Sequence, residues 1–88
     1  MSVVTAWRDM MICFQLAKIA WRDEERKFLL SSEEIKDIDD LFVEMQVIVD
    51  SFDYSRRHMN EFVAKQVVLS MLVAEAEHKM GYVSALDL

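Results

Sequence analysis

The sequence predicts an all-α protein, a three-helix antiparallel bundle that is completed by homo-oligomerisation. Three observations support this fold class. The 88-residue chain contains no Pro and one Gly, whereas the turns of a β-rich domain of this size usually recruit several such residues. Hydrophobic residues make up 53% of the chain and charged residues 30%, which is typical of a globular protein. The apolar residues recur at helical spacing, and the length fits one domain over residues 1–88.

The first expected helix covers residues 4–27. At 100° per residue, one main apolar face combines Trp7, Met10, Cys13, Phe14, Ala17, Ala20, Trp21 and Phe28. A narrower apolar strip contains Ile12, Leu16 and Ile19. A mostly basic edge separates the two strips and contains Arg8, Gln15, Lys18, Arg22 and Arg26. Cations at the end of this helix suit the negative pole of the helix dipole.

The second expected helix covers residues 32–51 and has the clearest start signal. Ser31 and Glu34 fit a capping box, in which each side chain accepts a hydrogen bond from the other residue's backbone amide. One apolar face combines Ile35, Ile38, Leu41, Phe42, Met45, Ile48, Val49 and Phe52. The outer face carries Asp39, Asp40, Glu44 and Asp50, together with Val43 and Val47. We expect these four acids to form a partner-facing surface that steers a basic protein.

The third expected helix covers residues 56–80, with Asp53 or Ser55 as its cap and Gly81 as a left-handed residue after its end. It is apolar on two faces. One face contains Val63, Ala64, Val67, Met71 and Ala74; the other contains Phe62, Leu69, Leu72, Val73, Ala76 and Met80.

The first and the third expected helix each have two apolar faces. Three helices in one small chain cannot bury all four of these faces. We therefore expect a homodimer or higher oligomer. The expected interface consists of Phe62, Leu69, Leu72, Val73 and Met80. The alternative is a compact monomer with an apolar groove, which would itself be a candidate partner site.

The residue pattern offers little for catalysis, and we expect no enzyme and no cofactor. One Gly excludes a Gly-rich phosphate loop. Cys13 lies on an apolar face without a His nearby in sequence, so we interpret it as a core filler. Glu75 and His78 have the spacing of a carboxylate-bridged metal site, but only Glu44 offers a further carboxylate. We expect no metal site.

The basic edge of the first helix is a candidate ligand site. Trp7 and Trp21 lie near it, and an indole beside cations is able to stack on a nucleotide-like anion. The candidate residues are Trp7, Arg8, Lys18, Arg22 and Arg26. The alternative interpretation is that these cations pair with the acids of the second helix, in the same subunit or in another.

The charge balance and hydropathy restrict the partners. With 16 acidic and 10 basic residues the net charge is −6, which argues against general nucleic-acid binding. No apolar run reaches the roughly 18 residues of a membrane span, and Arg8 and Asp9 interrupt any signal-peptide pattern. We expect a soluble cytoplasmic protein that binds itself and another protein, as an adaptor, chaperone or inhibitor. An oligomer that captures a small anion between subunits is the second hypothesis, and a metal-binding bundle is the third.

Overall fold

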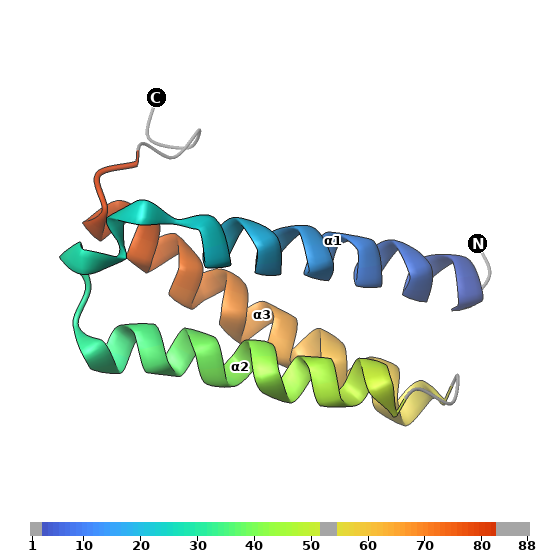
Figure 1. Cartoon of the computed structure of the whole chain (residues 1–88). Coiled ribbons are helices and arrows are strands. Elements are labelled where there is room, and N and C mark those ends of the chain that lie inside the picture. The colour runs from blue at the N-terminus through green and yellow to red at the C-terminus, as the bar shows by residue number, and fades with distance from the viewer. Residues whose placement is uncertain (1–2, 52–54, 83–88) are drawn as a thin grey trace.

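The computed structural model describes residues 3–51 and 55–82, and most of this part of the chain is helical (Figure 1). The elements are α1 (Val3–Asp23), a short 3₁₀ helix η1 (Glu25–Leu29), α2 (Ser32–Asp50) and α3 (Arg56–Lys79). No strand occurs in residues 3–51 and 55–82. The predicted all-α class with three long helices is therefore confirmed, while the homo-oligomer stays a prediction.

The three long helices differ in how closely they approach one another. α2 runs antiparallel to α1, and α3 returns obliquely behind them, so that its C-terminal end comes beside η1 (Figure 1). The backbones of α2 and α3 approach each other most closely. The backbone of α1 lies farther from α2 and α3 than these two helices lie from each other. Large side chains of α1 fill the space between, which accommodates aromatic rings in the core.

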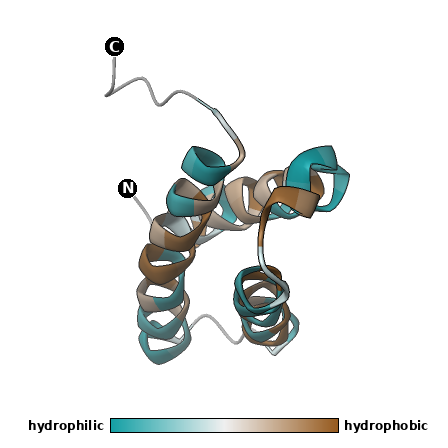
Figure 2. Cartoon of the chain, turned by 90° about the vertical axis from the view of Figure 1, so that its left-hand side faces the viewer, coloured by the Kyte–Doolittle hydropathy of each residue, from teal (hydrophilic) through white to brown (hydrophobic). Residues whose placement is uncertain are grey.

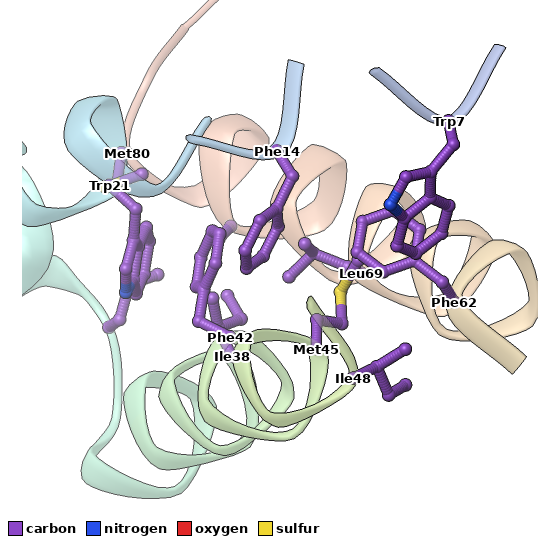
Figure 3. Packing of buried hydrophobic residues seen from close by; sticks show 12 residues of the cluster. Trp7, Phe14, Trp21, Ile38, Phe42, Met45, Ile48, Phe62, Leu69 and Met80 are labelled. Atoms are coloured by element: carbon purple, nitrogen blue, oxygen red, sulfur yellow. The ribbon is translucent and has the colours of Figure 1, made fainter. Parts of the chain in front are cut away.

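The core is built from residues that recur every seven positions on α1 and α3. The buried residues of these two helices include Trp7, Phe14 and Trp21 on α1 and Phe62, Leu69 and Ala76 on α3. From α2 come Ile38, Phe42, Met45 and Ile48. The Phe14 ring centre lies 5.8 Å from that of Phe42 and 5.5 Å from that of Phe62, so rings from all three helices meet (Figure 3). The Trp7 ring packs edge-on against Phe62 at 5.0 Å.

The first helix ends four residues earlier than expected. Glu24 has an extended backbone, and its side chain accepts a hydrogen bond from the Arg26 amide, which caps η1. This break changes which side chains point inward after Asp23. Phe28, which the unbroken period places on the core face, is 79% exposed, while Leu30 is buried. The expectation for Phe28 was therefore wrong.

Three small residues of the expected main face of α1 are also exposed, namely Cys13, Ala17 and Ala20. They flank the buried line on the side of α3, and their short side chains do not bridge the distance to it. Shallow hollows remain there; Ala17 and Ala20 line one of them together with Val73. Cys13 is therefore not a core filler, and the prediction of one continuous buried face was too wide.

The start of α2 and both ends of α3 match the sequence signals. The Ser31 Oγ accepts from the Glu34 amide, and Glu34 Oε1 accepts from the Ser31 amide, both at 3.2 Å. The Ser55 Oγ accepts from the His58 amide at 3.2 Å and caps α3. The other cap candidate, Asp53, and the apolar residue Phe52 lie outside the described residues.

α3 ends in a left-handed turn. Gly81 has φ +89°, a conformation that residues with a Cβ rarely adopt. The Tyr82 amide donates to the Glu77 carbonyl at 2.9 Å and the Gly81 amide to the His78 carbonyl at 3.1 Å. These two bonds form a Schellman motif, which satisfies carbonyl groups at the helix end.

Candidate functional site

A basic hollow lies between α1 and α2. Three cations, Lys18, Arg22 and Lys27, surround Trp21 there, and the hollow has a volume of about 220 Å³. Phe42, Val43 and Asp39 complete its lining. The Lys27 Nζ lies 4.8 Å from the centre of the Trp21 ring, a cation–π contact. The arrangement combines positive charge with an aromatic surface, which are the two features that favour a small aromatic anion.

The protein's own side chains neutralise only part of the positive charge of this basic hollow. The Trp21 Nε1 donates to Asp39 Oδ1 at 2.7 Å, so one carboxylate lies at its edge. The Lys18 Nζ donates to the neutral amide oxygen of Gln46 at 3.0 Å. Within the described part of the chain, Arg22 forms no ion pair. The hollow therefore retains positive charge that a ligand would neutralise.

The five residues that the sequence suggests for ligand binding lie in different parts of the structure. Lys18 and Arg22 line the basic hollow, whereas Trp7 is buried against Phe62 in the core. Arg8 is exposed and lies beside Asp9, with Arg8 Nε 3.9 Å from Asp9 Oδ1.

The remaining candidate, Arg26, belongs to a different cluster at the junction of η1 and α3. Its guanidinium lies 4.7 Å from the centre of the Tyr82 ring, and its Nη1 donates to the Met80 carbonyl at 3.4 Å. The Tyr82 hydroxyl donates to both carboxylate oxygens of Glu24, at 3.0 and 3.2 Å. Arg26 is therefore turned away from the basic hollow and holds the end of α3 against η1.

Hydrogen bonding at this junction shifts two pKa values. The backbone amide of Arg26, followed by the Tyr82 hydroxyl, stabilises the charged form of Glu24 and lowers its pKa. Donation to that carboxylate stabilises the protonated phenol and raises the pKa of Tyr82. Both side chains are exposed or half-buried, and their hydrogen bonds join the start of η1 to the residue that follows the α3 turn.

Two residues of the basic hollow, Trp21 and Lys27, are additional to the five candidates. The sequence predicts Trp21 near the basic edge and Lys27 at the helix end. An unbroken helix through position 27 does not predict a contact between them. The contact depends on the break at Glu24, which turns Lys27 back over the indole.

The four acids expected to face a partner are all engaged within the chain. Asp39 accepts from Trp21, and Asp40 pairs with Lys36 at 3.0 Å. Glu44 pairs with Lys65 at 3.3 Å, and Asp50 accepts from Gln46 at 2.9 Å. Their carboxylates are exposed, and lysines neutralise two of them, Asp40 and Glu44, so this surface is less strongly negative than the sequence suggests.

The residues expected at the oligomer interface lie in the chain's own core. Phe62, Leu69 and Met80 are buried, and Leu72 and Val73 pack against them. The helical period identifies two apolar faces on α3 without showing which one turns inward. The face with the larger side chains meets α1 and α2 because their wide separation has to be filled. A second chain would therefore contact the other face.

Two apolar helix faces remain exposed on the outside. The α3 outer stripe consists of Val63, Ala64, Val67, Val68, Met71 and Ala74, all of them exposed. The α1 outer face consists of Val4, Ile12, Leu16 and Ile19, which are also exposed. In Figure 2 the middle of α3 is coloured hydrophobic over several turns.

The candidate metal residues are not brought together. Glu75 and His78 are exposed on α3, and Glu44 is held by Lys65 on the face of α2. In residues 3–51 and 55–82, no three His, Cys, Asp or Glu side chains are arranged to hold an ion.

Comparison of the chain with protein-family models, with curated proteins and with solved structures finds no match. Among the helices described, none combines the length and the apolar character needed to cross a membrane.

Proposed function

We propose that the protein is a non-enzymatic helical module for protein–protein interaction, an adaptor, chaperone or inhibitor, that acts as a homo-oligomer. The observation that carries this proposal is the pair of exposed apolar faces, the α3 outer stripe and the α1 outer face. Contiguous apolar surface of this kind marks interaction sites in small proteins, because each Å² removed from water contributes about 25 cal/mol. The engaged acids of α2 contribute less to the proposal than the apolar faces do.

Two faces on different helices provide for two different contacts. They lie on α1 and α3, each turned away from the shared core residues Trp7, Phe14 and Phe62. A homodimer formed through one face leaves the other exposed for a second protein.

The test is the molar mass of the full chain in solution, measured by sedimentation equilibrium at micromolar concentration. We expect at least twice the chain mass of 10.3 kDa. A monodisperse 10.3 kDa species at the highest accessible concentration would contradict the homo-oligomeric part of the proposal.

The second candidate function is the capture of a small nucleotide-like anion, and the basic hollow favours it. Three cations around one indole provide charge and a stacking surface together. Arg22 in particular lacks an ion pair within the described residues. The presence of Asp39 at the edge limits the affinity for multiply charged anions.

Differential scanning fluorimetry at low salt tests this second candidate. A ligand that binds the folded state raises the melting temperature of the wild type in a saturable way, and Arg22→Ala abolishes that rise. Arg8→Ala is the matched control, because Arg8 is an exposed arginine of the same helix outside the basic hollow. If mono-, di- and cyclic nucleotides leave the wild type unchanged, or stabilise Arg22→Ala equally, the basic hollow is not their site.

A further inference from the structure

The α3 outer stripe is an uninterrupted apolar surface with charges only at its two ends. Its six residues are all apolar and extend about 17 Å along the helix from Val63 to Ala74. The one charged residue between them in sequence, Lys65, pairs with Glu44 of α2. Arg56 and Arg57 stand before the stripe at the N-terminus of α3, and Glu75 and Glu77 follow it near the C-terminus. All four charged side chains are exposed.

The cations at the start of α3 are in an unfavourable position for a helix on its own. The N-terminus of a helix is the positive end of its dipole, so Arg56 and Arg57 there are destabilising, whereas the last turn carries His78 and Lys79, which suit the negative end. The first turn of α3 contains no acid. Within the part of the chain that the structure describes, neither Arg57 nor Glu75 forms an ion pair that would compensate. An external surface that places an acid beside Arg57 and a cation beside Glu75 would pair both side chains.

Four residues of α3 lie along one line of the outer surface. Arg57 and Glu75 are eighteen residues apart, which is five helical turns, so they project in the same direction. Ala64 and Val68 lie seven and eleven residues after Arg57, within about 20° of the same line. Along this line a cation is followed by a small apolar residue, a larger apolar residue and an anion. The positions of the four residues are symmetric about the midpoint between Ala64 and Val68.

We propose that a second copy of this chain covers the α3 outer stripe, with the two α3 helices antiparallel about a two-fold axis at the level of this midpoint. Such an axis places Arg57 beside the partner's Glu75, and Ala64 beside the partner's Val68. Each pair occurs twice, once on either side of the axis, as an isologous contact requires. The inference rests on the proposed self-association and specifies its surface and orientation.

Charge decides between the two possible orientations of the helices. A parallel pair would set Arg57 against the partner's Arg57 and Glu75 against the partner's Glu75, and both contacts repel. The antiparallel pair turns both into attractions. Charge also favours α3 over α1 as the surface for self-association, since Arg8 interrupts the α1 outer face between Val4 and Ile12.

The first experiment compares the mass of the full-length wild type with that of two Glu variants by sedimentation equilibrium. Val67 and Leu16 have similar exposure, 56% and 62%, on the outer faces of α3 and α1. Because both side chains are exposed, neither Val67→Glu nor Leu16→Glu should unfold the chain, and far-UV circular dichroism checks this. We expect a dimer for the wild type and for Leu16→Glu, and a 10.3 kDa monomer for Val67→Glu.

The second experiment tests the antiparallel orientation by exchanging charges. Arg57→Glu places two acids together at both ends of an antiparallel dimer, and we expect the dimer dissociation constant to rise about tenfold. The double variant Arg57→Glu with Glu75→Arg restores both attractions and should return the constant to within about twofold of wild type. In a parallel dimer the double variant would merely exchange one pair of repulsions for another and would not rescue.

The outcomes separate the inference from the proposal beneath it. A wild-type dimer that Leu16→Glu dissociates and Val67→Glu does not would place the contact on α1, overturning the inference while leaving the self-associating module intact. A dimer that Val67→Glu dissociates but the double charge variant fails to restore would overturn the antiparallel orientation. A monomeric wild type would overturn both.

Discussion

Replacing Phe14 by Ala is the sharpest test of how the three helices are joined. Phe14 is 0% exposed, and its ring contacts Phe42 of α2 and Phe62 of α3 (Figure 3). A Phe→Ala change in a packed core costs about 3–5 kcal/mol, from lost burial and from the cavity that remains. A chain of this length has a free energy of unfolding of about 4–13 kcal/mol. The substitution should therefore remove at least about a fifth of the stability and, at the lower limit of stability, unfold the protein.

Phe28→Ala is the matched control, because it removes the same atoms from a ring that is 79% exposed. Changes at exposed positions without special contacts stay within about 0.5 kcal/mol. The pair also tests the break at Glu24. An unbroken helix through position 27 puts both rings on one buried face and predicts similar losses.

Guanidinium denaturation followed by far-UV circular dichroism measures both variants. One fixed protein concentration is needed, since the stability of an oligomer depends on concentration. A loss below 1 kcal/mol for Phe14→Ala, or equal losses for the two variants, would refute the assignment of the core.

Three further outcomes follow from the helix ends. Hydrogen bonding by Lys79 lowers the pKa of Glu34, so this carboxylate stabilises the fold at neutral pH, and the contribution disappears as the pH falls through the lowered pKa. Glu34→Gln should therefore be less stable than wild type at pH 7, and urea denaturation should show this difference shrinking as the pH falls through the lowered pKa of Glu34. Because donation to Glu24 raises the pKa of Tyr82, Glu24→Gln should shift part of the alkaline absorbance titration to lower pH. Gly81→Ala should cost about 1 kcal/mol of unfolding free energy because φ is +89° and no atom lies near the added Cβ, and Gly81→Asn should cost less.

Local signals predicted the elements well where the chain itself supplies both partners of an interaction. The Ser31–Glu34 capping box, the Ser55 cap and Gly81 each act within one turn, and each was located from sequence. The inward face of α2 was also predictable, since this helix is apolar on one broad side and acidic on the other. Periodicity identifies an inward face when there is only one candidate.

The failures arise where the answer depends on neighbouring helices. Glu24 is an ordinary helix former, and its role as a cap for η1 depends on the hydrogen bond to Arg26 and on Tyr82 from the far end of the chain. The two faces of α3 are similar in hydropathy, so only the spacing between helices decides that Phe62 points inward. The basic edge of α1 was similarly divided, because the break turns Arg26 towards Tyr82 and away from Lys18 and Arg22.

The core uses only a narrow line of residues on α1 and α3, so it does not explain why their outer faces are apolar. The buried aromatic residues of α1 are seven positions apart, and their size allows this helix to stand away from α2 and α3. A helix that buries one narrow line leaves its opposite side free to be polar at no cost to the core. On α3 that side nevertheless carries six exposed apolar residues between Val63 and Ala74, although the chain as a whole is acidic. The core residues of α3 do not account for these apolar side chains, whereas the second copy that we propose, antiparallel to the first, would use both the stripe and the charges beyond its ends.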